Sequence, residues 1–415
     1  MKNKIYRAID ARREDIIRIA EQVMKNPELG YKEYKTSELV KQELGKLGVS
    51  CRSGLALTGV KGTVGKADAE INVAVIGELD AIRCFGHPDA DPETGAAHAC
   101  GHHAQIAILL GAAYGILESG VLDELDGKVT FFAVPAEEFA ELEYREQLKR
   151  DGKISYFGGK QELISLGEFD DIDISMMLHS LSDSPEPTIL LGGSSLGFTA
   201  KQISFKGKAV HGSEPFEGVN ALNAAMLALM GIHANRETFR DSDKVRIHPI
   251  ITNGGELVNV VPAKTTIETY VRGARAEAIE DACRKVDAAV RGGAMAVGAE
   301  CEIVDTVGYL PLHQDKELTE IFAENAKELV GEEHLRYGID MIGSTDMGDL
   351  SAKMPCIHPS MGGYVGSAHG IDFATVDPDA AYILPAKLLA ATVCDLLRDG
   401  AARAKSIKAN FNAKK

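Results

Sequence analysis

Ile71-Asn72-Val73-Ala74-Val75-Ile76 is a short, mostly apolar and β-branched run, the composition of a strand buried on both faces. Residues 129–134 form a second run of this kind. Between them, residues 103–118 are apolar and long enough for a helix. Two amphipathic helices, residues 5–23 and 36–47, are predicted at the start of the chain. Strand, helix and strand in this order predict an α/β layer with a buried sheet.

Polar residues follow the predicted strands where each of them ends. Asp80 closes the first strand, Glu137 follows the second, and a third apolar run over residues 172–178 ends directly at His179. In open α/β sheets, ligands collect at the carboxyl ends of the strands. We therefore expect these polar side chains to share one edge of the sheet.

The sequence pattern changes after residues 192–195, a glycine- and serine-rich stretch that predicts a hinge. Residues 196–308 contain strand-like and helical stretches in the order β-α-β-β-α-β, which is typical of a ferredoxin-like unit. The α/β pattern then returns and ends with an apolar helix over residues 380–397. We predict a discontinuous larger domain, residues 1–195 and 309–415, into which the smaller domain is inserted.

Length, charge and cysteine content limit the classes of protein that fit. A chain of 415 residues exceeds what one hydrophobic core usually serves. The formal charge of −16 argues against nucleic acid or an anionic membrane as a partner, because both need a cationic face. No signal-peptide core and no apolar run of about 18 residues is found. Seven scattered cysteines indicate free thiols in a reducing cytoplasm.

The hexapeptide His98-Ala99-Cys100-Gly101-His102-His103 lies between the first strand and the apolar helix. Cys100 and His102 are two residues apart, so a loop can turn both side chains toward one ion. A helix N-terminus just downstream favours the thiolate form that metals bind. An ordinary polar loop is the alternative, but three imidazoles and a thiol within six residues favour a metal site.

Two adjacent carboxylates, Glu137 and Glu138, follow Pro135 at the end of the second strand. Such a pair can divide its work between binding a metal and holding a water, or it can simply complement a helix dipole. Asp80 can accept the distal N–H of His102 and fix the ring, or it can be a surface turn residue.

Two more histidines complete the set of candidate ligands. His179 closes a buried strand, and His369 lies in Gly366-Ser367-Ala368-His369-Gly370. Each of them alone is more often structural. Together with Cys100, His102 and Glu138 they offer five ligands, which is enough for two metal ions that share a bridge.

These motifs resemble those of a large family of di-metal amidohydrolases and exopeptidases. The family includes aminoacylases, glutamate-releasing carboxypeptidases, hydrolases of auxin conjugates and p-aminobenzoyl-glutamate hydrolase. His-Ala-Cys-Gly-His followed by Glu-Glu is typical of its cysteine-containing branch. The matching segments cover nearly the whole chain: Asn26-Pro27-Glu28-Leu29-Gly30, Leu79-Asp80-Ala81, residues 98–102, Glu137-Glu138, Leu178-His179, Lys208-Ala209-Val210-His211, Asn259-Val260-Val261-Pro262, Arg272 and Gly343-Ser344-Thr345-Asp346. Within this family, the last segment, Gly343-Ser344-Thr345-Asp346, favours the p-aminobenzoyl-glutamate hydrolases.

The resemblance implies a fold, a cofactor and a partner. The fold is a zinc-exopeptidase-like, three-layer α/β catalytic domain with an inserted ferredoxin-like α+β domain for a lid and for dimerisation. The cofactor is a pair of divalent ions per subunit, zinc or manganese, with Cys100 shared between them. The implied ligands are Cys100, His102, Glu138, His179 and His369. The implied partner is a second copy of the chain, bound through the inserted domain.

The resemblance also implies a reaction, the hydrolysis of an amide or peptide bond in a small N-acyl or aminoacyl amino acid or a dipeptide. A metal-activated water attacks the carbonyl, and Glu137 is the general base, with Asp80 supporting His102. His211 in the inserted domain stabilises the oxyanion, often from the partner subunit. Asn259 and Arg272 position a substrate carboxylate.

Two departures from the family pattern are visible. His103 replaces the usual acidic or amide residue, and residues 83–97 insert a loop that we expect near the mouth of the site. Two other functions stay open. One is a thiol hydrolase with Cys100 as nucleophile and His98 or His102 as base, and the other is a non-catalytic metal-binding scaffold.

Overall fold

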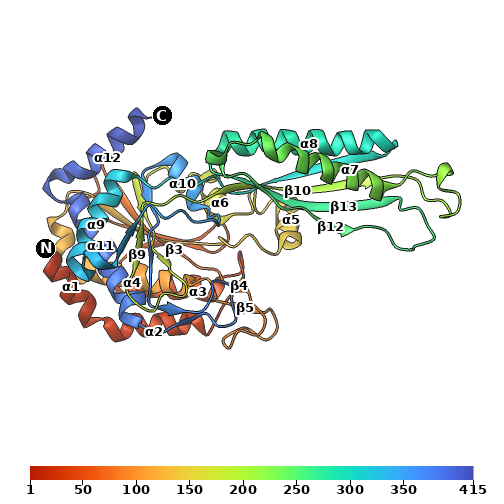
Figure 1. Ribbon diagram of the computed structural model, residues 1–415. Coiled ribbons are helices and arrows are strands. Elements are labelled where there is room, and N and C mark those ends of the chain that lie inside the picture. The colour runs from red at the N-terminus through yellow and green to blue at the C-terminus, as the bar shows by residue number, and fades with distance from the viewer. Residues whose placement is uncertain (415) are drawn as a thin grey trace. The chain divides into compact units, whose positions relative to one another are not determined.

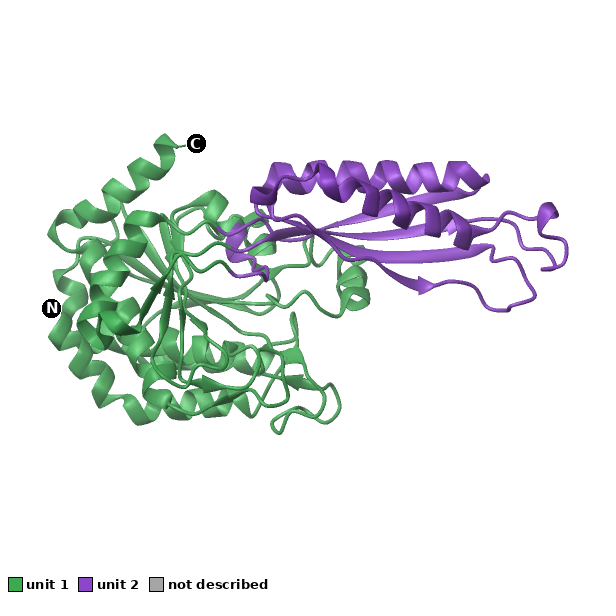
Figure 2. Cartoon of the chain, in the orientation of Figure 1, with its two compact units in different colours: residues 1–194, 313–340, 349–415 green, residues 195–312, 341–348 purple. Residues whose placement is uncertain are grey.

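The structure is a computed structural model that describes residues 1–414 and divides into two compact units. Unit 1 consists of residues 1–194, 313–340 and 349–415, and unit 2 of residues 195–312 and 341–348 (Figure 2). Each unit has a sheet and a hydrophobic core of its own. Each therefore has the anatomy of a domain.

Unit 1 is built on a six-stranded sheet with the order β1-β2-β6-β3-β7-β16. The strands are β1 (Cys51–Leu55), β2 (Gly59–Gly65), β3 (Asn72–Glu78), β6 (Lys128–Val134), β7 (Ile174–Met176) and β16 (Cys356–Ile357). The last four are parallel neighbours, whereas β1 and β2 are antiparallel additions at one edge. Every residue of β3 is buried, as expected of a central strand with both faces covered.

The metal-motif loop, residues 98–101, leads into an apolar helix, α4 (His102–Glu118), which lies between β3 and β6 in the chain. The helix is buried on every side as far as Ile116, because it packs on the sheet and also contacts other helices. Those helices, α1 (Lys2–Ala11), α2 (Arg13–Met24) and α11 (Leu384–Leu397), gather beside it (Figure 1). The first predicted helix is thus two helices, α1 and α2, which meet at Arg12.

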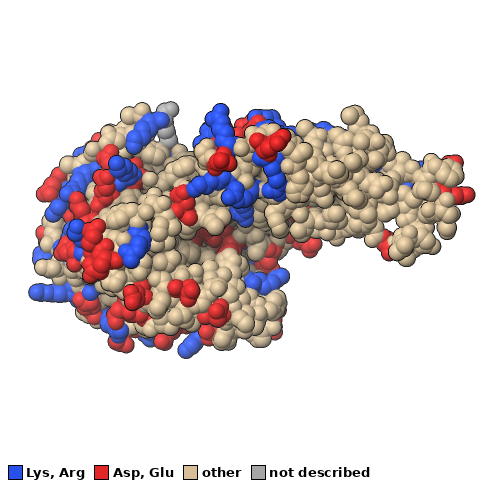
Figure 3. Space-filling model, viewed as in Figure 1, with Lys and Arg blue, Asp and Glu red and all other residues tan. Residues whose placement is uncertain are grey.

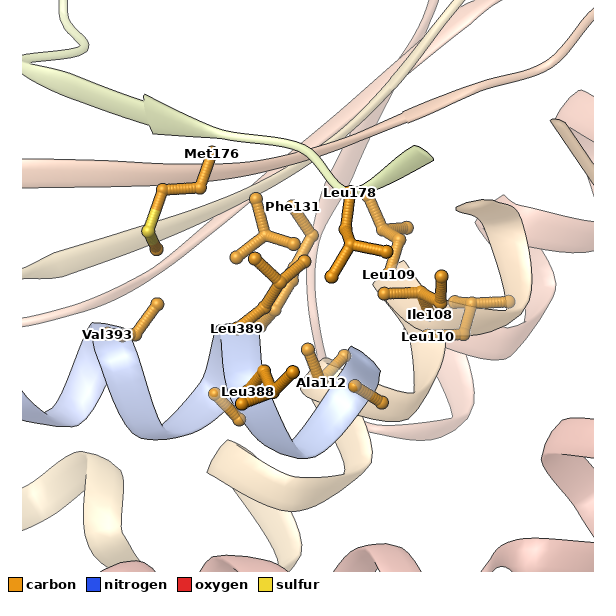
Figure 4. Packing of buried hydrophobic residues seen from close by; sticks show 14 of the residues in the cluster. Ile108, Leu109, Leu110, Ala112, Phe131, Met176, Leu178, Leu388, Leu389 and Val393 are labelled. Carbon is orange, nitrogen blue, oxygen red and sulfur yellow. The ribbon is translucent and has the colours of Figure 1, made fainter. Parts of the chain in front are cut away.

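The core of unit 1 fills the space between α11 and the sheet. Leu389 and Val393 of α11 point toward the strands that carry Phe131 and Met176 (Figure 4). All four side chains are fully buried. The remaining helices are α3 (Tyr34–Lys46), α5 (Leu142–Arg150), α6 (Gly159–Ser165), α9 (Lys316–Val330), α10 (Met347–Lys353) and α12 (Ala402–Ala413).

A second sheet in unit 1 begins where β7 ends. Its order is β15-β9-β17-β8, and its strands are β8 (His179–Ser180), β9 (Ile189–Leu191), β15 (Leu335–Tyr337) and β17 (Ser360–Met361). β8 runs parallel to β17, with His179 opposite Ser360. His179 is therefore fixed by strand pairing directly after the third buried run.

Unit 2 has the ferredoxin-like order that the sequence predicts. Its elements are β10 (Gly197–Lys206), α7 (Ala221–Ala234), β11 (Arg246–Ile247), β12 (Ile250–Asn253), β13 (Lys264–Gly273), α8 (Ala276–Val297) and β14 (Glu300–Val307). β10 lies between β13 and β14, and both β11 and β12 pair with β13. Helices α7 and α8 pack together on one side of the sheet (Figure 1). Pro249 separates β11 from β12 because proline has no N–H to donate.

The boundaries of unit 2 differ from the predicted range of 196–308. Unit 2 also contains residues 195, 309–312 and 341–348. Arg272 Nη1 donates to Ser344 Oγ at 2.6 Å, and the Leu196 N–H donates to the Gly343 carbonyl at 3.1 Å. These long-range hydrogen bonds leave no periodic signal in the sequence, so the sequence pattern alone places the returning segment in the larger domain.

One helical stretch, Asp379–Leu397, is long and apolar enough to cross a membrane. However, 89% of its most apolar window is buried inside the protein. This is the environment of a core helix, and α11 makes up most of it. All seven cysteines are free thiols.

Candidate metal centre

All five predicted metal ligands come together at the carboxyl edge of the unit 1 sheet. Their donor atoms form two groups of three, and within each group the atoms lie within 4.8 Å of one another. One group is Cys100, His102 and His179, and the other is Cys100, Glu138 and His369. Because Cys100 belongs to both groups, its thiolate could serve two ions at once.

The distances inside these groups suit ligands of a common ion. Cys100 Sγ lies 3.5 Å from His179 Nε2, and Glu138 Oε1 lies 3.3 Å from His369 Nε2. Two donors bound tetrahedrally, with bonds of about 2.0–2.3 Å, are themselves about 3.3–3.6 Å apart. Thiolate, imidazole and carboxylate are also the donors that zinc and related metals accept. The residues present therefore fit two divalent metal ions.

Backbone carbonyls orient two of the imidazoles. The Nδ1–H of His102 donates to the Asp80 carbonyl at 2.8 Å, and the Nδ1–H of His179 donates to the Ser180 carbonyl at 2.8 Å. Both rings therefore present Nε2 to the cluster. The Asp80 carboxylate also lies 3.3 Å from His102 Nδ1 and accepts the Glu138 N–H at 3.0 Å. This is the supporting position that the sequence predicts for Asp80.

The turn before α4 depends on Gly101. Its φ is 89°, in the left-handed region that favours glycine. A Cβ at this position would lie 2.5 Å from Ser180 Oγ, which in turn donates to the Cys100 carbonyl at 2.8 Å. The glycine thus lets the loop approach β8 and brings the Cys100 thiol beside His179.

The protein alone does not hold all these donors in the forms that bind metal. Burial and the Glu138 carboxylate hold the pKa of the Cys100 thiol well above its ordinary value. Burial would lower the pKa of His102, but Glu78 and Cys100 raise it well above its usual range. Burial favours neutral Glu138, yet its hydrogen bond with His369 lowers the pKa of Glu138. A bound divalent cation would favour the metal-binding form of each of these donors, because it stabilises thiolate, carboxylate and neutral imidazole together.

Glu137 and Glu138 lie in a loop before α5, rather than at a helix start. Ala136 has a φ of 53°, and its N–H donates to Glu33 Oε1 at 2.8 Å. Arg145 Nη2 donates to the Glu138 carbonyl at 2.5 Å. Glu33 and Arg145 were not predicted, because they hold the loop through its backbone and no motif links them to it.

A third donor group joins Glu78 to His102 and Glu137. Glu78 ends β3 two residues before Asp80 and is 1% exposed. We did not predict it as a site residue. Its signal in the sequence is the Glu78-Leu79-Asp80 spacing, because alternate residues of an extended chain share a side.

Three other histidines near the motif, His87, His98 and His103, lie outside the three donor groups. His98 and His103 are fully buried, with ring centroids 5.7 Å apart, and His103 Nε2 is 3.3 Å from the Tyr382 hydroxyl. In the inserted loop, His87 Nε2 is 2.9 Å from the Phe373 carbonyl. β4 (Ile82–Arg83) and β5 (Ala96–Ala97) pair at the base of that loop.

The three other predicted site residues belong to unit 2. His211 is exposed, with Nδ1 2.6 Å from Ser213 Oγ. The Gly212 N–H donates to the Asn259 carbonyl at 2.7 Å, so Asn259 lies on the segment next to His211. The Arg272 guanidinium lies 5.3 Å from the ring centre of Phe198.

A family model described as Peptidase family M20/M25/M40 matches residues 74–394. The chain therefore belongs to this family, and the predicted resemblance is confirmed. The matched residues contain all five candidate ligands, together with Asp80, Glu137 and the three unit 2 residues.

Several hydrolases are similar in sequence. The mouse Xaa-Arg dipeptidase is 30% identical over 306 residues, which are 72% of this chain and 62% of that protein. The chain thus spans less than two thirds of its length. The hippurate hydrolase of Campylobacter jejuni is 25% identical over 352 residues, 82% of this chain and 86% of that protein. An IAA-amino acid hydrolase of Arabidopsis thaliana is 27% identical over 358 residues, 82% of this chain and 75% of that protein.

Solved structures confirm the predicted fold class. A dinuclear metal binding peptidase of the M20 family from Bacillus subtilis aligns with a TM-score of 0.74 at 21% identity, over 94% of this chain and 99% of its own. The aminobenzoyl-glutamate utilization protein of Klebsiella pneumoniae aligns with a TM-score of 0.70 at 17% identity, over 94% of this chain and 98% of its own.

Proposed function

We propose that this chain is a metal-dependent hydrolase of the amide or peptide bond in small N-acyl or aminoacyl amino acids or dipeptides. The observation that carries the proposal is the pair of donor groups that share Cys100. The names of the mouse, Arabidopsis and Campylobacter relatives support the reaction class. The similarity to the dinuclear metal binding peptidase of Bacillus subtilis supports two ions.

In this proposal the five residues described above would hold the two ions, which are zinc or manganese. The thiolate ligand favours zinc over manganese. Two bound ions supply a water with a pKa near 7 and polarise the substrate carbonyl. Glu137 lies beside this centre, with Oε2 3.9 Å from His102 Nε2. Its carboxylate takes the proton of the attacking water and returns it to the leaving amine nitrogen. Asp80 keeps the His102 ring in place.

The proposed roles of the unit 2 residues follow from their chemistry. His211 donates a hydrogen bond to the oxyanion that forms at the carbonyl. Arg272 offers a planar guanidinium, and Asn259 an amide, to the substrate carboxylate. The Arg272 guanidinium donates to the neutral hydroxyl of Ser344. This hydrogen bond uses one N–H of Nη1, so the guanidinium keeps further N–H groups for a carboxylate.

Removal of metal tests the proposal most directly. We expect EDTA to abolish hydrolysis of N-acyl amino acids and dipeptides, and Zn²⁺ or Mn²⁺ to restore it, because no protein group replaces the activated water. A thiol hydrolase would keep its activity in EDTA. Two bound ions without turnover on a broad substrate panel would indicate a non-catalytic scaffold.

We also propose that two copies of the chain pair through unit 2. On the face shown in Figure 3, charged side chains are dense over unit 1 and sparse over α7 and the long strands of unit 2. Helix α7 exposes Met226, Leu227 and Met230, and strand β12 exposes Ile250 and Ile251. An exposed apolar edge strand beside an apolar helix face is suited to pairing with another chain. The free cysteines support a cytoplasmic location for this dimer.

If His211 acts across the dimer, mixed dimers of His211→Ala and Glu137→Gln protomers will recover activity. One site then combines an intact Glu137 with an intact His211 from the partner. Each homodimer alone is expected to lose about 10²–10³-fold in kcat or more. Dimers purified through two different affinity tags provide the measurement.

The reverse mixture is the control. A dimer of one doubly substituted protomer and one wild-type protomer is expected to be inactive, because the intact Glu137 faces a partner without His211. If this dimer is active and the first mixture is not, His211 works within its own subunit.

A further inference from the structure

Glu78 is placed on the side of His102 that faces the metal centre. The Nδ1 atom of His102 is bonded to the Asp80 carbonyl, whereas Glu78 Oε2 lies 3.0 Å from Nε2. An imidazole nitrogen and a carboxylate oxygen that bind one ion at about 2.0–2.2 Å lie about 2.9–3.4 Å apart. The Glu78 oxygen thus stands at the distance of a second ligand to the ion that His102 binds.

Two buried partners hold the Glu78 carboxylate from behind. The Lys160 ammonium forms an ion pair with Oε1, and Gln105 Nε2 donates to Oε2 at 2.7 Å. The Glu78 N–H in turn donates to Gln105 Oε1 at 3.0 Å. The side chains of Glu78 and Lys160 are 1% and 0% exposed. The carboxylate is therefore fixed before any ion arrives, and binding costs little further conformational entropy.

We propose that Glu78 is an additional ligand of the metal ion that His102 holds, and that Lys160 is the permanent counter-charge of this ligand. The inference rests on the proposed function, because it assumes the two-metal centre. It adds a sixth protein ligand, which comes from the end of β3 rather than from the metal-motif loop.

Lys160 provides a counter-charge for the buried Glu78 carboxylate in the metal-free protein. An unpaired charge at this depth would be strongly destabilising, and removal of one partner from a buried ion pair leaves such a charge. Because Lys160 pairs with Glu78, the ion gains an oxygen ligand whose charge is at least partly balanced within the protein.

The test is a Zn²⁺ titration in chelator-buffered solution, with bound ions counted by native mass spectrometry. We expect the wild type to bind two ions. In Glu78→Gln, the affinity for one ion should fall by about 100-fold or more, since loss of a supporting residue alone costs about 10–100-fold. The affinity for the other ion should fall less than about 10-fold, because its ligands are untouched.

Glu43→Gln is the matched control. Glu43 is also a buried acid with a lysine partner, as its Oε1 lies 2.6 Å from Lys46 Nζ, but it lies outside all three donor groups. This variant should bind both ions as the wild type does. If Glu78→Gln also binds both ions with wild-type affinity, the role of Glu78 is overturned while the proposed function stands. If the wild type binds no pair of ions, the proposed function itself fails.

Lys160→Met gives an independent readout through thermal stability. Without Lys160, His102 is the partner that remains for Glu78 in the metal-free protein. A bound ion then adds a divalent cation, so Zn²⁺ should raise Tm more in this variant than in the wild type. An equal shift would overturn the counter-charge role. If Lys160→Met does not fold in EDTA, the double variant Glu78→Gln and Lys160→Met removes both charges. It should fold and show the same loss of affinity for one ion as Glu78→Gln.

Discussion

A Glu137→Gln variant is expected to bind two metal ions and to lose nearly all hydrolytic activity. The amide keeps the shape of the side chain but cannot take a proton from the attacking water, so kcat should fall by about 10²–10⁴-fold. Metal content after dialysis and kcat for an N-acyl amino acid are the two measurements. Because Glu137 lies outside the two groups that share Cys100, the ions should stay bound.

Glu141→Gln is the control for this prediction. Glu141 lies in the same loop, but its carboxylate binds Lys32 and Arg83 at 2.8 and 3.0 Å, and it belongs to none of the donor groups. It should keep close to wild-type kcat. Substantial turnover in Glu137→Gln would contradict the role of Glu137 as the base.

Replacement of Cys100 by Ala is expected to weaken both ion sites at once. Cys100 is the only member that the two donor groups have in common, so both should lose affinity by about 100-fold or more. Activity should disappear in parallel and should return in part at high metal concentration. The measurement is the number of bound ions as a function of free Zn²⁺.

This variant also separates the metal mechanism from a thiol nucleophile. A nucleophilic Cys100 would give a variant that is inactive at every metal concentration and still binds both ions. Cys51→Ala, which changes a half-buried thiol outside the donor groups, should leave both properties unchanged.

The sequence predicted the parts of the fold that depend on local pattern. The buried run at residues 71–76 became β3, the apolar stretch after it became α4, and the inserted segment has the expected ferredoxin-like order. These elements are predictable because their periodicity and burial are properties of neighbouring residues. The unit boundary was less predictable, since the return of residues 341–348 to unit 2 rests on contacts such as Arg272 with Ser344.

The candidate site was predictable where residue chemistry is concentrated in short motifs. Cys100, His102 and Glu138 stand in such motifs, and the side chains of all five candidate ligands meet in the structure. Glu78 was missed because an acid in a buried strand carries no motif of its own. Glu33 was missed because it acts on a backbone N–H about a hundred residues away.

The order of strands in unit 1 has a consequence for the synthesis of the protein. β7 pairs with β16, so one edge of the main sheet stays open until Cys356 and Ile357 have left the ribosome. At about 5–20 residues per second, this takes roughly 10–40 s after β7 is made. Unit 2 is translated completely within that interval, as residues 195–312 and 341–348 all lie between β7 and β16. During biosynthesis the inserted unit is therefore ready to fold first, while the sheet of unit 1 still lacks the strand that pairs with β7.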